Sequence, residues 1–189
     1  MTKERTLVLI KPDAMQRSIV GKIISRFEDT GLKIAAMKMV WADEAMASAH
    51  YTLDMAWANN VFNKTKAVYE KEKKQMEYKT PEELGKTVQS WLVKFLKESP
   101  IIAFILEGPH AIELVRKMIG HTEPRQALPG TIRADFMSIE SYAVADAKKR
   151  VIKNLIHASD SNENAEREIA LWFKPTEIHT YSNNLERSL

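Results

Sequence analysis

The chain has 189 residues, of which 44% are hydrophobic and 28% are charged, with a net charge of +3 and no cysteine. These values fit a single domain with its own core, and they exclude disulfides, thiolate chemistry and cysteine-bound zinc. The apolar run near the N-terminus is too short for a secretory or membrane-spanning segment, so we expect a cytoplasmic protein without a membrane partner. The basic run Lys71-Glu-Lys-Lys contains an acid, which favours a solvated helix face over a nucleic-acid patch.

Strand and helix patterns alternate along the chain. Periodicity predicts, in order, a strand over Arg5–Ile10, a helix over Ile19–Thr30, a strand over Leu32–Trp41, a helix over Asp43–Leu53, two helices on either side of Pro81 within Asp54–Glu98, a strand over Pro100–Leu106, and helices over Pro109–Ile119 and Ser161–Phe173. Pro12 cannot donate a ladder hydrogen bond, so it ends the first strand and leaves Lys11 at the strand end. Thr80-Pro81 is a typical helix start, and Gly120 is a typical helix end.

The remaining segments show no clear period. His121–Phe136 contains Pro124, Pro129 and Gly130 and is expected to be loop-like. The tail from Lys174 is rich in turn residues, and we expect it to wrap another part of the molecule.

Strands separated by helices predict an α/β (α+β) fold of the ferredoxin-like, split βαβ type. This fold has an antiparallel four-stranded sheet with helices on its face, here with additional inserted helices. The first three strands follow directly from the patterns. For the fourth, the candidates are the stretch around Thr176–Tyr181 and the segment after Phe136. Residues 1–189 are expected to form one domain.

His157 is the centre of a candidate site for phosphoryl transfer. A neutral imidazole can attack phosphorus, and the transfer otherwise needs cations and donors placed around the travelling charge. Suitable side chains come from separate places in the chain: Lys11, Arg116, Thr122, Arg133 and Asn154. Glu168, on the last predicted helix, is placed to bind one imidazole nitrogen and leave the other free to attack.

Two alternatives compete with this interpretation. A single histidine between Ile156 and Ala158 is more often a packed or surface residue than a nucleophile. A metal site is not predicted, because the five histidines include no pair at helical i, i+4 spacing and the chain has no cysteine.

Three sequence blocks, taken in this order, resemble the nucleoside diphosphate kinase family. They are Ile10-Lys-Pro-Asp, Gly130-Thr-Ile-Arg-Ala-Asp-Phe, and Asn154-Leu-Ile-His-Ala-Ser-Asp with the following Glu168-Ile-Ala-Leu-Trp-Phe; His50-Tyr51 and Glu107-Gly108 are supporting matches. The resemblance covers nearly the whole chain apart from insertions at about 54–98 and 138–150. It implies transfer of the γ-phosphate of a nucleoside triphosphate to a nucleoside diphosphate by a ping-pong mechanism, with broad base specificity.

The resemblance also implies a role for each matched residue. His157 would carry the phosphoryl group, with Glu168 and Ser159 orienting or approaching it. The nucleotide would be bound by Lys11 at the sugar hydroxyl and transferred phosphate, Tyr51 beside the γ-phosphate, Arg116, Thr122 and Arg133 at the phosphates, Asn154 at the ribose, and Phe62 or, alternatively, Trp57 at the base. Mg²⁺ would be bound through the nucleotide phosphates. A homo-oligomer is expected, and the tail after Phe173 is a candidate for crossing between subunits.

Departures from the family pattern keep a second hypothesis open. Ala14, Ala134 and Ala158 stand where the family usually has glycine, and alanine disfavours a positive φ. The alternative is therefore a catalytically weak or inactive relative that acts as a nucleotide- or nucleic-acid-binding module.

Overall fold

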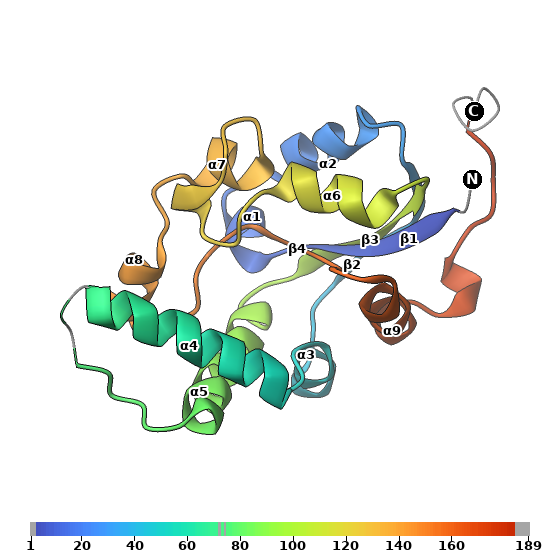
Figure 1. Ribbon diagram of the computed structural model, residues 1–189. Coiled ribbons are helices and arrows are strands. Elements are labelled where there is room, and N and C mark those ends of the chain that lie inside the picture. The colour runs from blue at the N-terminus through green and yellow to red at the C-terminus, as the bar shows by residue number, and fades with distance from the viewer. Residues whose placement is uncertain (1–2, 72, 74, 184–189) are drawn as a thin grey trace.

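The structure is a computed structural model that describes residues 3–71, 73 and 75–183. Its centre is an antiparallel four-stranded sheet in the order β2-β3-β1-β4 (Figure 1). The strands are β1 Glu4–Ile10, β2 Lys33–Val40, β3 Ile101–Gly108 and β4 Ile156–Ala158. This order and the helices that cover the sheet confirm the predicted α+β architecture.

Helices connect the strands and cover the sheet. They are α1 Pro12–Gln16, α2 Val20–Glu28, α3 Glu44–His50, α4 Met55–Lys71, α5 Pro81–Leu96, α6 Ala111–Ile119, α7 Ile132–Met137, α8 Tyr142–Ala147 and α9 Asn162–Trp172, with 3-10 turns at Pro124–Gln126 and Pro175–Glu177. The side chains of Asp43, Thr80 and Ser161 cap α3, α5 and α9, and the start of α5 at Thr80-Pro81 was predicted from the sequence.

The central strands β1 and β3 are buried on both faces. Val8 and Ile10 pack on the side of α2 and α6, whereas Leu7 and Leu9 pack on the side of α3, α5 and α9 (Figure 1). Alternate residues of a strand point to opposite faces, so burial on both faces explains why β1 and β3 are apolar without alternation. The two strands that carry this core are the central ones, and β4 is held on the outer side of β1.

The fourth strand differs from the prediction. Neither the stretch around Thr176–Tyr181 nor the segment directly after Phe136 forms it, and the strand is Ile156–Ala158, which pairs with Val8–Ile10 of β1. Three residues are too few to show a strand period, so the pairing with β1 rather than the local sequence defines this element. His157 therefore lies on a strand, opposite Leu9.

The segment 121–136, expected to be loop-like, ends in a helix. Thr131 caps α7 by accepting a hydrogen bond from the Ala134 N–H at 3.4 Å, and Ile132 is fully buried in the core beneath it. A single turn of helix held by packing has too little sequence to reveal its period, which explains the difference.

The tail folds back along the outer edge of β2. The His179 N–H donates to the Ala35 carbonyl at 2.8 Å, the Tyr181 hydroxyl donates to the Ile34 carbonyl at 2.8 Å, and Lys38 pairs with Glu177 at 2.7 Å. These contacts confirm that the tail wraps another part of the molecule, and they lie within the same chain. Among the residues that the structure describes, no helix is long and apolar enough to span a bilayer.

Candidate active site

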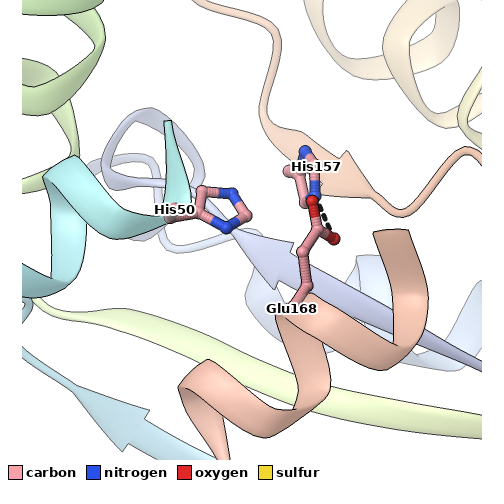
Figure 2. A group of neighbouring side chains, drawn as sticks. All are labelled: His50, His157 and Glu168. Atoms are coloured by element: carbon pink, nitrogen blue, oxygen red, sulfur yellow. Dashed lines mark hydrogen bonds and ion pairs between the residues drawn. The ribbon is translucent and has the colours of Figure 1, made fainter. Parts of the chain in front are cut away.

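His157 on β4 and Glu168 on α9 form the pair predicted from the sequence. His157 Nε2 lies 2.9 Å from Glu168 Oε2, and the imidazole points toward the carboxylate (Figure 2). A carboxylate accepts hydrogen bonds, so the pairing places the proton of a neutral ring on Nε2 and leaves Nδ1 unprotonated. Glu168 is 4% exposed, so this contact is shielded from water.

Ser159 holds the carboxylate in place. Its hydroxyl donates to Glu168 Oε2 at 2.7 Å and accepts a hydrogen bond from the Leu7 N–H at 3.2 Å. The Ser159 N–H in turn donates to the Leu7 carbonyl at 3.1 Å. Ser159, two residues after His157, thus ties the Glu168 carboxylate to the central strand β1.

His50, at the end of α3, packs directly against His157. The two imidazole rings meet edge to face with centroids 4.5 Å apart, and Figure 2 shows them facing the same space beside Glu168. Burial, followed by the neighbouring His157, lowers the pKa of His50 well below its ordinary value. The Trp172 N–H donates to His50 Nδ1 at 3.2 Å, so the neutral ring carries its proton on Nε2.

His50, His157 and Glu168 are the one group of potential metal ligands in the described part of the chain, with their ligand atoms within 4.8 Å of one another. Their hydrogen bonds oppose metal binding. His50 would have to bind a metal through Nε2 while Nδ1 accepts from Trp172, which requires loss of the ring proton. The Glu168 oxygen is already bound by two donors.

Lys11 and Asn154 meet beside the start of β4. The Lys11 ammonium donates to Asn154 Oδ1 at 2.8 Å, and the Asn154 amide donates to the Thr122 carbonyl at 2.8 Å. Lys11 is 6% exposed, and burial, followed by the nearby Arg133, lowers its pKa to about 7. The structure therefore brings together three sequence-predicted residues, from the junction of β1 and α1, the loop after α6 and the segment before β4.

Arg133 has a different environment from the one that its predicted phosphate contact suggests. It is 4% exposed, and its guanidinium donates to three backbone carbonyls, those of Asn154 at 3.2 Å, Gly120 at 2.9 Å and Ile156 at 2.7 Å. Burial, followed by the charge of Arg116, lowers its pKa to about 10. Arg133 is thus part of the scaffold, with one N–H left on each terminal nitrogen because guanidinium has five donors.

Tyr51 supplies a hydroxyl without a partner. Its Oη is buried and has no hydrogen bond, and its ring lies edge to face with His50 at 4.6 Å between centroids. Burial, followed by the charges of Glu168 and Asp13, raises the pKa of this hydroxyl, so it remains a donor. A buried polar group without a partner is rare, and here it lies next to the site where a phosphoryl group is expected.

The remaining predicted residues are exposed or half-buried. The residues Arg116 and Thr122 are exposed, and Phe62 and Trp57 are half-buried on α4, which packs against α5 (Figure 1). The stacking of the base on Phe62, with Trp57 as the competing residue, stays a prediction.

The alanine substitutions carry no backbone penalty. Among residues 3–71, 73 and 75–183, the non-glycine residues with positive φ are Ser18, Lys73, His110, Lys149 and Leu155. Ala14, Ala134 and Ala158 are not among them, so a glycine is not required at these positions for its conformational freedom.

Two residues that contact the site were quoted in the sequence blocks without a role. His50 stands next to Tyr51, and Asp13 stands two residues after Lys11. Asp13 is 3% exposed and accepts a hydrogen bond from the Leu155 N–H at 2.9 Å. The sequence shows only that Asp13 is an acidic residue just after a predicted strand end, and its burial, which is rare for a charge without a partner, is seen only in the structure.

Comparison with known proteins gives consistent matches over most of the chain. The sequence model of the family "Nucleoside diphosphate kinase" matches residues 4–77 and 58–178. A nucleoside diphosphate kinase of Pyrobaculum aerophilum is 42% identical over 182 residues, which make up 94% of this chain and 99% of that protein. The enzyme of that name from Borreliella burgdorferi is 39% identical over 186 residues, covering 98% and 96% of the two chains.

Solved structures agree with the sequence matches. The crystal structure of an NDP kinase from Pyrobaculum aerophilum superposes on this chain with a TM-score of 0.90 at 39% sequence identity. The match covers 95% of this chain and 100% of that chain. A transition-state mimic of the Borrelia burgdorferi enzyme with bound vanadate and ADP superposes with a TM-score of 0.79 at 38% identity, covering 98% and 96%. On these matches of sequence and fold, the chain belongs to the nucleoside diphosphate kinase family.

Proposed function

We propose that this chain transfers the γ-phosphoryl group of a nucleoside triphosphate to a nucleoside diphosphate through phosphorylated His157. The observation that carries the proposal is the hydrogen bond between His157 Nε2 and Glu168, at 2.9 Å. It leaves Nδ1 as the nucleophile, and the Glu168 carboxylate would stabilise the positive charge that develops on the ring as Nδ1 bonds to phosphorus.

The charges around His157 suit a polyphosphate. The site has three cationic side chains, those of Lys11, Arg116 and Arg133. Lys11 and Arg133 are buried, and the low dielectric around them strengthens their attraction for a phosphate. The free hydroxyl of Tyr51 supplies an uncharged donor. We assign the phosphates to these groups, with Thr122 at the exposed end, and the ribose hydroxyl to Asn154.

Mg²⁺ is proposed to arrive on the nucleotide. The three cationic residues of the site bind phosphate oxygens rather than a metal ion, and Mg²⁺ commonly uses substrate phosphates as ligands. The Borrelia burgdorferi structure, which contains vanadate and ADP, supports the assignment of a nucleotide and a phosphoryl mimic to one site in a relative.

Initial rates with ATP as donor and GDP as acceptor test the proposal. A ping-pong enzyme gives parallel lines when reciprocal rate is plotted against reciprocal ATP concentration at several GDP concentrations. CDP and UDP should also serve as phosphate acceptors in place of GDP, because any base can stack on an aromatic ring. Intersecting lines would indicate direct transfer between two bound nucleotides and would contradict a phosphoenzyme.

We expect nucleotide binding to couple to proton uptake by Lys11. The pKa of Lys11 is about 7 in the free protein, and bound phosphates would raise it, so at pH 8 Mg·ADP binding should take up close to one proton. Calorimetric titration in two buffers with different ionisation enthalpies measures this number. Lys11→Met should reduce it to near zero, and an unchanged uptake in that variant would assign the proton to another group.

The same pKa predicts a pH effect on stability. Between about pH 7 and the ordinary lysine value of 10.5, the unfolded chain binds more protons at Lys11 than the folded chain does. The contribution of Lys11 to the free energy of unfolding should therefore rise with pH across that window.

The base is proposed to stack on Phe62, with Trp57 as the competing residue. Loss of a stacking ring costs about 1–3 kcal/mol of binding, so Phe62→Ala should raise the Kd of ADP by about tenfold or more. Trp57→Ala is the matched variant, because both rings are half-buried on α4. A larger effect in Trp57→Ala than in Phe62→Ala would transfer the assignment.

Self-association is proposed through the uncovered part of β2. Met37 and Met39 are 41% and 62% exposed on this edge strand, and Trp41, which follows it, is 65% exposed. These alternate positions share one face of the strand, and an apolar edge strand favours pairing with another chain. We expect Met39→Glu to lower the mass seen by sedimentation equilibrium.

Ile139→Glu is the control for this experiment, because Ile139 is 86% exposed and far from β2 in sequence. It should leave the mass unchanged. Equal masses for wild type and Met39→Glu would show that β2 is not the interface.

A cytoplasmic location and the bounds of the two insertions stay predictions.

The alternative, a binding module without activity, predicts nucleotide binding without a phosphoenzyme. The comparisons give it no support, since the matched relatives are named as kinases. The polar residues that the reaction needs are also present, and His157 and Ser159 are both hydrogen-bonded to Glu168.

A further inference from the structure

The backbone immediately before β4 contains a strained turn. Leu155 has φ 66°, and the Ile156 N–H donates to the Asn154 carbonyl at 2.7 Å, which closes a three-residue γ-turn around Leu155. A γ-turn with positive φ is rare and strained, and leucine, unlike glycine, pays a steric penalty in this region. The Leu155 side chain is fully buried, at 0% exposed, so packing fixes its position.

Two groups from one short segment hold this turn. The Asp13 carboxylate accepts a hydrogen bond from the Leu155 N–H at 2.9 Å, and the Lys11 N–H donates to the Leu155 carbonyl at 2.8 Å. Both polar groups of the strained residue are therefore bound between β1 and the first turn of α1. Pro12 lies between them and restricts their relative movement.

The turn lies between two residues of the proposed reaction. Asn154, before it, binds the Lys11 ammonium at 2.8 Å, and His157 follows two residues after Leu155. Relaxation of Leu155 to negative φ would change the direction of the chain between them. The conformation of one peptide unit thus sets the position of the attacking imidazole relative to the lysine.

We propose that Asp13 is a positioning residue, which holds Leu155 in the strained turn and thereby places His157 for attack on the phosphoryl group. This role rests on the proposed phosphotransfer function. The hydrogen bond of Asp13 is to the backbone N–H of Leu155, and we infer that Asp13 acts on His157 through this backbone. Its other oxygen, Oδ1, is buried without a partner, so the carboxylate is held at the cost of one unsatisfied acceptor.

The test compares the effect of Asp13→Ala in two backgrounds, Leu155→Gly and Leu155→Ala. Both backgrounds remove the leucine side chain, but only glycine adopts positive φ without strain. The measured quantity is the single-turnover rate of phosphate transfer from ATP to the protein. Asp13→Ala should slow this rate by about 100-fold in the Leu155→Ala background, because a small displacement of a reacting group has effects of this size.

In the Leu155→Gly background the loss should be smaller by about tenfold, since the turn no longer needs to be held against strain. Asp13→Asn, which keeps an oxygen acceptor, should retain most of the wild-type rate. Equal losses in the two backgrounds would overturn the proposal, and so would a loss in Asp13→Asn as large as in Asp13→Ala, because the charge and not the hydrogen bond would then matter.

Amide hydrogen exchange provides a readout that does not depend on activity. The Leu155 N–H should exchange slowly in the wild type and at least about tenfold faster in Asp13→Ala, while the Leu9 amide of β1 stays protected as the control for folding. Equal protection of Leu155 in both proteins would overturn the proposal even if the double variants do not fold. Absence of phosphoenzyme in the wild type, with the exchange difference present, would instead contradict the proposed function.

Discussion

Replacing His157 by alanine is expected to abolish nucleotide turnover, with a loss of at least about 10⁴-fold in kcat. The imidazole is the one group whose bond to Glu168 leaves a nucleophilic nitrogen free, and the neighbouring His50 is bound to Trp172 through Nδ1 and carries its proton on Nε2. ADP should still bind within a few-fold of the wild-type affinity, because the cations Lys11 and Arg116 remain. A coupled assay for GTP formation and calorimetry with Mg·ADP measure the two quantities.

His179→Ala is the matched control for this variant. His179 is exposed, and its hydrogen bond to Ala35 uses the backbone N–H rather than the imidazole, so this change should alter neither turnover nor stability. Turnover by His157→Ala above a small fraction of wild type would show that another group carries the phosphoryl group or that transfer is direct.

Replacing Arg133 by methionine is expected to lower the free energy of unfolding by about 3 kcal/mol and to remove most activity. Its guanidinium donates to the carbonyls of Asn154, Gly120 and Ile156 from a buried position. Loss of the donors leaves buried carbonyls short of partners, at about 1–3 kcal/mol for each that water cannot reach. Urea denaturation measured by circular dichroism gives the stability change.

Comparison with Arg116→Met separates two roles of a cation at this site, binding of the nucleotide and support of the backbone. Arg116 is exposed on α6, so its replacement should weaken nucleotide binding while the free energy of unfolding changes by no more than about 0.5 kcal/mol. Arg133→Lys should recover only part of the loss in Arg133→Met, because an ammonium lacks the planar fork that reaches three carbonyls. Equal stability of Arg133→Met and Arg116→Met would refute the scaffold role of Arg133.

The sequence predicts the sheet well where its strands are long. The strands β1, β2 and β3 contain seven or eight residues with clear apolar runs, and each was predicted within a few residues of its observed ends. The strand β4 has three residues, too few for a period, and its identity depends on pairing with β1. The helix α7 was missed for a similar reason, because one turn of helix is stabilised by packing of Ile132 rather than by local propensity.

The types of the site residues were predictable, but of their contacts only the pairing of Glu168 with His157 was predicted. Family resemblance selects Arg133 as a phosphate ligand, but only the fold reveals that it holds the backbone of Asn154 and Ile156. The strain at Leu155 could not be predicted either, because leucine gives no sequence signal for positive φ, as glycine would.

The central claim is that His157 carries the phosphoryl group, and one labelling experiment tests it most directly. The protein is mixed with γ-labelled ATP and Mg²⁺ for a single turnover and then chased with unlabelled GDP. We predict label on the wild-type protein that is labile to acid and stable to base, absent from His157→Ala, and transferred to GDP in the chase. Nucleotide binding with no label on the wild-type protein, or label that persists in His157→Ala, would contradict the account.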